Sequence, residues 1–180
     1  MCILPSFHNQ TPDMAIYVSK IHNSWHIQSR SDLFSHPSII TINVITDQDT
    51  FLMINVYNPS DCTSLSPLIH AKLPHHKVIV SGDFNLYHPL WSKPSHASKI
   101  SDNSELLVDS ISSKGFLPLN LPGVETFFWK DYSSVLDLTW IFTHISPHIS
   151  DFEVNFPMFA GSDHNPLFNL LIRLALAIVI

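Results

Sequence analysis

The sequence predicts an α/β sandwich with many strands and few helices. Three observations predict it: eight apolar runs of strand length, helical patterns in only two places, and three acidic motifs at strand ends. The chain has 180 residues, of which 45% are hydrophobic and 13% charged, so it has enough apolar material for one substantial core. No repeat and no linker divides it, and we expect a single domain over residues 1–180.

Eight runs rich in Ile, Val, Phe and Thr have the length and composition of β-strands. They cover residues 15–19, 39–45, 51–57, 78–80, 126–129, 136–142, 152–155 and 167–172. The second and third runs are separated by five polar residues, a connection of hairpin length. We therefore expect these two runs to pair as antiparallel strands.

The clearest helical pattern covers residues 102–114. Asp102, with Glu105 three residues on, resembles a capping box, apolar residues recur on successive turns, and Gly115 supplies the stop. A second pattern over residues 64–73 is weaker because a proline must lie in its first turn. These two segments are the expected helices.

Two further segments are not expected to be helical. Residues 86–100, with two prolines and several Ser and His, have the composition of a loop. Residues 170–180 are apolar, but a membrane span needs about twenty apolar residues, and Arg173 interrupts the stretch. We interpret 168–172 as a closing core strand, assign no purpose to the tail after it, and expect no membrane partner.

The formal net charge is −6, from nine Lys and Arg against fifteen Asp and Glu. Proteins that bind nucleic acid by neutralising phosphates show clusters of Lys and Arg, and no basic run occurs here. The charge balance therefore argues against tight nucleic-acid binding by this chain alone.

The two cysteines and twelve histidines lack the spacing of a zinc site, and two distant cysteines give no disulfide framework. No N-terminal segment has the order of a signal peptide. We expect an intracellular, reducing location and no secretion.

Three short acidic motifs follow one another along the chain. They are Gly-Asp-Phe-Asn at 82–85, Ser-Val-Leu-Asp-Leu-Thr at 134–139 and Gly-Ser-Asp-His-Asn-Pro-Leu at 161–167. Each adjoins an apolar run that we expect to be a strand, so its polar side chains would stand on rigid scaffold. Carboxylates, an amide and a histidine at strand ends suit metal-assisted hydrolysis.

The first motif continues as Gly-Asp-Phe-Asn-Leu-Tyr-His-Pro-Leu-Trp over residues 82–91, and the Ser-Asp-His box follows near the C-terminus. These residues resemble the endonuclease/exonuclease/phosphatase superfamily, and most closely the apurinic-type endonuclease domain of non-LTR (LINE-like) retrotransposons. The resemblance runs from Ala15 to Leu171. It implies a DNase I-like fold, with two mixed β-sheets packed face to face, helices outside and the active site at one edge.

The resemblance implies Mg²⁺-dependent phosphodiester hydrolysis, with Mn²⁺ as an alternative ion, by a DNA endonuclease of the retrotransposon type. DNA would be bound weakly by this chain alone, a reverse transcriptase domain encoded downstream would be a partner, and a retroelement protein would act in the nucleus. Two alternatives stay open: a catalytically inactive remnant, and a phosphatase or lipid phosphodiesterase of the same superfamily. The His-Pro-Leu-Trp extension favours the endonuclease over the phosphatase.

By the same resemblance, His164 would stabilise the charged phosphorane or help to activate the nucleophile. Asp137 would hold the His164 ring in one tautomer and orientation. Asp163 would be the metal ligand. Each of Asp137 and His164 also has an ordinary reading as a residue of a turn.

Asp83 would activate water or handle the leaving-group proton, and Asn85 would orient the phosphate or Asp83 itself. Tyr57 matches a Tyr-x-Pro strand end where the phenol reaches the phosphate. Against these readings, Asp and Asn are common turn formers after strands, and an aromatic residue at a strand end is most often core. Tyr87 and Trp91 could stack on a base, and we favour packing for both.

The superfamily's first strand supplies an Asn and its second ends in a metal-binding Glu, and residues 1–14 match neither. Residues 14–20 instead resemble a later strand that carries an exposed aromatic. The resemblance therefore implies a domain that is incomplete at the N-terminus, with its first strands missing, and that holds Mg²⁺ loosely.

Overall fold

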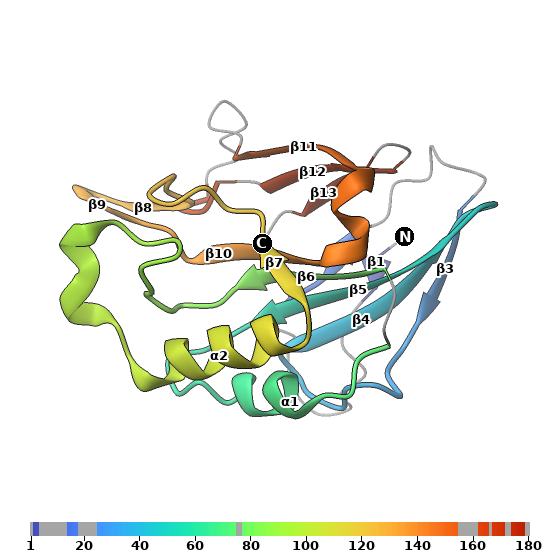
Figure 1. Ribbon diagram of the computed structural model, residues 1–180, viewed down its shortest axis with the longest axis horizontal. Helices are drawn as coiled ribbons and strands as arrows, with labels where there is room; N and C mark the ends of the chain where they lie inside the picture. Colours follow the sequence, from blue (N-terminus) through green and yellow to red (C-terminus); the bar gives the residue numbers. More distant parts are fainter. Residues whose placement is uncertain are drawn as a thin grey trace.

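A six-stranded mixed sheet forms the centre of the computed structural model (Figure 1). In spatial order its strands are β3 (His26–Ser29), β4 (Ile39–Ile45), β5 (Thr50–Tyr57), β6 (Val78–Asp83), β10 (Asp137–Phe142) and β7 (Phe116–Pro118). Strands β5 and β6 are parallel, and the other neighbours are antiparallel. The structure describes residues 2–3, 14–17, 25–74, 77–154, 162–165, 167–171 and 174–178.

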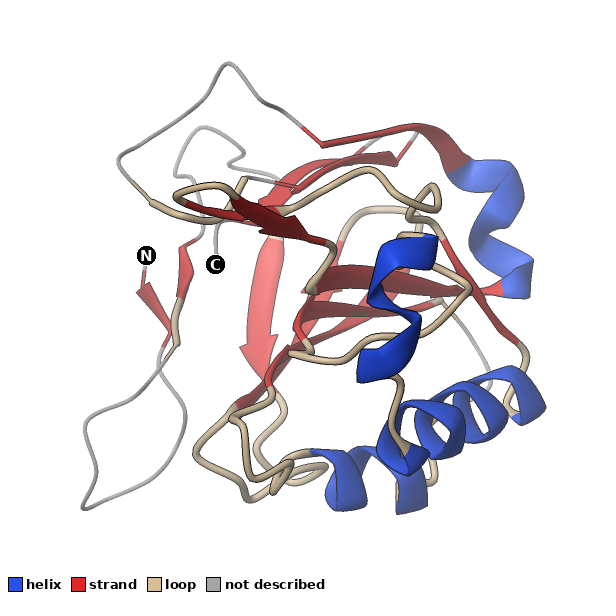
Figure 2. Ribbon diagram, turned by 90° about the vertical axis from the view of Figure 1, so that its left-hand side faces the viewer, coloured by secondary structure: helices blue, strands red, loops and turns tan. Residues whose placement is uncertain are grey.

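A smaller antiparallel sheet lies on one side of the central sheet, and the two α-helices lie on the other (Figures 1 and 2). The smaller sheet consists of β11 (Ile149–Val154), β12 (Leu167–Leu171) and β13 (Leu174–Ile178), and the helices are α1 (Leu65–His70) and α2 (Asp102–Ser113). Two-stranded ribbons are formed by β1 (Cys2–Ile3) with β2 (Ile16–Tyr17) and by β8 (Phe127–Trp129) with β9 (Tyr132–Ser134). The α/β sandwich that the sequence predicts is confirmed.

The central sheet is buried on both faces. Every residue of β6 and β10 is buried, and so are six consecutive residues of β5. This burial explains why these strands are nearly continuous apolar runs instead of alternating ones. Two polar side chains inside the sheet bond to each other, because the hydroxyls of Ser81 and Thr139 lie 2.8 Å apart.

All eight predicted strands are found, and β4 and β5 form the predicted antiparallel pair. Parts of three predicted strands, at residues 18–19, 155 and 172, lie outside the described residues, and so do Gly161 and Pro166 of the third motif. Strands β1, β3, β7 and β9 were not predicted, because each is only two to four residues long. The apolar tail, to which we assigned no purpose, forms β13 and pairs with β12.

Helix α2 confirms the clearest helical prediction, with Gly115 at φ +83° just beyond it. The predicted capping box is wrong by one residue. Ser101, in extended conformation, is the N-cap, and it exchanges hydrogen bonds with Ser104. Asp102 and Glu105 instead lie in the first turn, where negative charge favours the helix dipole.

Helix α1 is shorter than predicted, with Pro67 in its first turn. The segment 86–100 is not loop throughout, because the 3₁₀ helix η1 (Pro94–Lys99) forms within it. Its first residue is a proline, whose fixed φ suits a helix start. A second 3₁₀ helix, η2 (Thr143–His148), precedes β11. Across the part of the chain that is described, no helix is long and apolar enough to cross a membrane.

Gly82 sits where the backbone of β6 passes closest to β5. Its φ is +149°, and a Cβ at this position would overlap the carbonyl oxygen of Val56, which cannot move without breaking the sheet. We expect Gly82→Ala to lower the free energy of unfolding by roughly 3 kcal/mol or more. Chemical denaturation would measure it.

Gly123→Ala is the matched control for that experiment. Gly123 also has a positive φ, but its Cβ would meet only the flexible Lys93 side chain at 3.7 Å. The expected cost is about 1–2 kcal/mol, from the left-handed backbone alone. Equal losses in both variants would contradict the steric explanation for Gly82.

Candidate active site

The strand register brings three predicted site residues side by side at one edge of the central sheet. Tyr57 at the end of β5 pairs with Asp83 at the end of β6, and Asp83 pairs with Asp137 at the start of β10. In Figure 1 the ends of β5 and β6 and the start of β10 meet at the left of the sheet, beside the β8–β9 ribbon. Residues up to 80 positions apart in sequence therefore share one site.

Asp137 and His164 form the best-defined contact of the site. The Nδ1–H group of His164 donates to both carboxylate oxygens of Asp137, at 3.0 and 2.9 Å. The Asp137 carboxylate is only 1% exposed, and its own main-chain N–H donates to Thr126 Oγ1. The bond to Asp137 fixes the ring orientation and leaves Nε2 as the atom that can meet a substrate.

The segment that carries His164 is attached to the β8–β9 ribbon. His164 forms an isolated β-bridge with Phe127, and their rings lie 5.0 Å apart in an edge-to-face arrangement. The main-chain N–H of Phe128 donates to the carbonyl oxygen of Asp163 at 2.7 Å, and that of Asn165 donates to Thr126 at 2.6 Å. Main-chain hydrogen bonds thus hold the histidine in place.

Asn85 forms two hydrogen bonds with Asp83. Its main-chain N–H and its side-chain amide each donate to one oxygen of the Asp83 carboxylate, both at 3.0 Å. The amide also donates to the carbonyl oxygen of Asn58 at 3.0 Å. Both amide hydrogens of Asn85 are therefore in use, and donation to a phosphate would require breaking one of these bonds.

The pKa values of Asp83 and His164 are shifted from the usual values of a carboxyl and an imidazole group. Burial, reinforced by the negative charge of Asp137, raises the pKa of Asp83 to about 7. Burial lowers the pKa of His164, but the hydrogen bond and charge of Asp137 outweigh it, so that pKa lies above its usual value. The site therefore contains a carboxyl group that exchanges its proton near neutral pH, beside an imidazole whose protonated form is favoured.

Asp163 and Tyr57 are at the margin of this arrangement. The Asp163 side chain is exposed, and its charge contributes to raising the pKa of His164. Tyr57 is half-buried and packs against the core. Within the described residues, no three His, Cys, Asp or Glu side chains group closely enough to hold a metal ion.

Three buried residues that were not predicted support the site. Asn58 donates to the carbonyl oxygen of Phe84 at 2.7 Å, and Thr126 accepts the N–H groups of two consecutive residues at the start of β10. Asn120 donates to the carbonyl oxygen of Asp137 at 3.0 Å. In the sequence, only the polarity of these residues among apolar neighbours could have indicated a role in the site, because their hydrogen-bond partners are distant in sequence.

Trp91 packs inside the protein, as we favoured. It is 0% exposed, its ring lies edge-on to Trp140 at 5.8 Å, and its Nε1–H donates to the carbonyl oxygen of Leu86. Tyr87 is half-buried, with its hydroxyl 2.7 Å from that of Tyr132. Neither ring is a fully exposed platform for a base.

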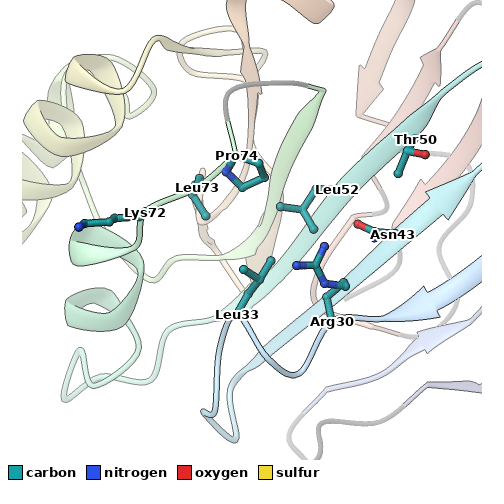
Figure 3. A pocket seen from close by; sticks show the side chains of 8 residues that line it. All are labelled: Arg30, Leu33, Asn43, Thr50, Leu52, Lys72, Leu73 and Pro74. Atoms are coloured by element: carbon teal, nitrogen blue, oxygen red, sulfur yellow. The ribbon is translucent and has the colours of Figure 1, made fainter.

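A cavity of about 400 Å³ lies at the opposite end of β5 (Figure 3). It is lined by Arg30, Leu33, Asn43, Thr50, Leu52, Lys72, Leu73 and Pro74. Its one guanidinium is held by both oxygens of Asp32. None of the predicted site residues lines it, so it is separate from the candidate active site.

Solved structures of nucleases share this fold. The endonuclease domain of TRAS1, a telomere-specific non-LTR retrotransposon, matches with a TM-score of 0.71 and 20% identity over 89% of this chain and 71% of that chain. An AP endonuclease from Archaeoglobus fulgidus matches with a TM-score of 0.59 and 14% identity, over 83% and 80%. The 3′ phosphatase NExo from Neisseria, bound to a product DNA hairpin, matches with a TM-score of 0.58 and 15% identity, over 82% and 70%.

A search of curated proteins found no match. The family model described as endonuclease-reverse transcriptase matches residues 51–168, which is more than half of the chain and includes both Asp83 and His164. The fold is that of the DNase I-like endonucleases, as the sequence predicts. The chain therefore belongs to the endonuclease-reverse transcriptase family.

Proposed function

We propose that the chain hydrolyses phosphodiester bonds in DNA, as an endonuclease of the retrotransposon type. The observation that carries the proposal is the hydrogen bond from His164 to the buried Asp137, next to a second carboxylate, Asp83, that is half protonated near pH 7. Hydrolysis needs a group that handles the nucleophile's proton and a group that stabilises charge on the phosphate. Both kinds of group are present at this edge of the sheet.

His164 and Asp83 would divide the proton transfers between them. The raised pKa of His164 favours the protonated imidazole, whose Nε2–H can donate to a phosphate oxygen as charge develops. Asp83, held in place by Asn85, can take the proton of the attacking water or return one to the leaving oxygen. A pKa near 7 suits either transfer at neutral pH. Tyr57 would contact the phosphate, and Asp163 would contact a metal ion.

Mg²⁺, or Mn²⁺ in its place, would supply further charge neutralisation at the phosphate. The described residues do not fit a cage built by the protein itself, since no three suitable side chains group together among them. The proton transfers above are therefore assigned to the chain's own residues alone. Asp163 would be the protein ligand to the ion, by the resemblance of its Ser-Asp-His box.

DNA is the proposed substrate, and a reverse transcriptase domain encoded by the same element is the proposed partner. The family description names both an endonuclease and a reverse transcriptase. The neighbouring structures include a retrotransposon endonuclease and an enzyme bound to a DNA hairpin. A protein of such an element would act in the nucleus.

Supercoiled plasmid is the substrate that tests the proposal. We expect purified wild-type protein to convert supercoiled plasmid to the nicked form slowly with Mg²⁺, and not at all with EDTA. Asp137→Asn, purified in parallel, controls for contaminating nuclease and is expected to be inactive. Absence of nicking by folded wild-type protein would instead support an inactive remnant. Release of phosphate from a 3′-phosphorylated oligonucleotide without nicking would support a phosphatase.

A further inference from the structure

The ammonium group of Lys99, the last residue of η1, lies over the aromatic rings of Tyr87 and Tyr132. Its ammonium lies 4.2 Å from the ring centre of Tyr132 and 4.9 Å from that of Tyr87, and it donates a 2.6 Å hydrogen bond to the Tyr132 hydroxyl. Three other cations of the described chain are paired with carboxylates, namely Arg30 with Asp32, Lys77 with Asp49 and Lys93 with Glu125. No described carboxylate forms such a pair with Lys99.

The Lys99 cluster, which we define as Lys99, Tyr87 and Tyr132, has N–H groups left over on Lys99. The two phenol oxygens lie 2.7 Å apart and share one hydrogen bond, which uses one of the two phenolic protons. Lys99 uses one of its three N–H groups on Tyr132 and keeps two. The two remaining N–H groups and the positive charge suit an anion with several oxygens.

The cluster lies beside the candidate active site. The Phe127 ring packs edge-to-face against His164 at 5.0 Å and against Tyr132 at 6.5 Å, so a single side chain separates the cluster from the catalytic histidine. Burial and the bond to Tyr132 raise the pKa of Tyr87 to about 12, with a smaller contribution from the charge of Asp83. Tyr87 therefore keeps its proton throughout the neutral range.

We propose that Lys99, Tyr87 and Tyr132 bind a backbone phosphate of the DNA strand adjacent to the scissile phosphate. The inference rests on the proposed function and adds a positioning site to it. In a chain of net charge −6, an unpaired cation next to the catalytic residues is where local charge favours the DNA backbone. Such a contact fixes the register of the strand without reading its sequence.

The competing explanation is purely structural, in which Lys99 joins η1 to the β8–β9 ribbon. Two variants separate the explanations. Lys99→Met keeps an unbranched apolar stem on the two rings and removes the charge, whereas Lys99→Arg keeps the charge and can still donate to an anion. Lys72→Met is the matched control, because Lys72 lies at the cavity on the opposite end of the sheet (Figure 3).

Fluorescence anisotropy of a short labelled DNA duplex measures binding to the protein. EDTA prevents cleavage, and a series of salt concentrations gives the salt dependence of the binding constant. We expect Lys99→Met to weaken binding of unrelated sequences equally and to reduce the slope of log K against log salt by about one. Lys99→Arg and Lys72→Met should keep the wild-type slope. Tyr87→Phe should weaken binding by at most a few-fold and keep the wild-type slope, because it removes a hydroxyl that bonds to Tyr132 and no charge.

An unchanged slope in Lys99→Met, with the wild-type melting temperature and continued nicking by the wild type, would overturn this inference and leave the proposed function standing. A lower melting temperature with an unchanged slope would also overturn it, in favour of the structural role. Failure of the wild-type protein either to bind or to nick DNA would overturn the proposed function and this inference together.

Discussion

Replacement of His164 by alanine is expected to reduce plasmid nicking by at least about 10³-fold and to leave the fold nearly intact. The imidazole bonds to Asp137 on one side and leaves Nε2 for the substrate, so its loss removes the group that meets the phosphate. The main chain around it remains held by the Phe127 bridge. Initial rates of nicking, together with circular dichroism and the melting temperature, would measure both effects.

His164→Asn is the matched control for folding. The amide nitrogen of Asn occupies nearly the place of Nδ1 and can still donate to Asp137, so the buried carboxylate keeps a partner. We expect this variant to melt close to the wild type and to be as inactive as the alanine variant. Nicking at near wild-type rates by either folded variant would show that His164 is not catalytic.

The pairing of Asp137 with His164 could be predicted because the motifs that contain them resemble those of a known superfamily. Asp83 ends β6 and Asp137 begins the antiparallel β10, so the register places the two carboxylates side by side at one sheet edge. The contact of Asn85 with Asp83 is one of the two roles predicted for it, and its contact with Asn58 could not be anticipated. Its two amide hydrogens go to Asp83 and to the carbonyl of Asn58, and the second contact depends on a loop 27 residues earlier.

The Lys99 cluster shows why some other features of the structure could not be predicted from the sequence. Residues 86–100 have the composition of a loop, and nothing in them reveals that η1 forms or that Lys99 meets Tyr132, 33 residues further on. Strand β3 was missed for a related reason. It is a mostly exposed edge strand without an apolar run, so its pairing with β4 is decided by main-chain hydrogen bonds and not by a side-chain pattern.

Asp83→Asn is expected to remove activity and to make the unfolding free energy less dependent on pH. The carboxylate of Asp83 is 4% exposed and its pKa is raised from 3.8 to about 7. The folded protein therefore binds this proton more tightly than the unfolded chain does. The stability that this difference provides is present below about pH 4 and is lost as the pH rises through 7. At pH 8 the folded state holds an ionised carboxylate that burial and Asp137 both disfavour.

Asparagine does not titrate, so the difference in unfolding free energy between variant and wild type isolates this one group. A pKa change from 3.8 to about 7 corresponds to roughly 4 kcal/mol, and the difference should grow by that amount in favour of the variant between pH 4 and 8. Nicking should fall by about 10²-fold or more at every pH. Urea denaturation at several pH values would measure the first effect. A difference that stays constant with pH would mean that Asp83 is ionised throughout, and then it could not supply a proton to the leaving oxygen.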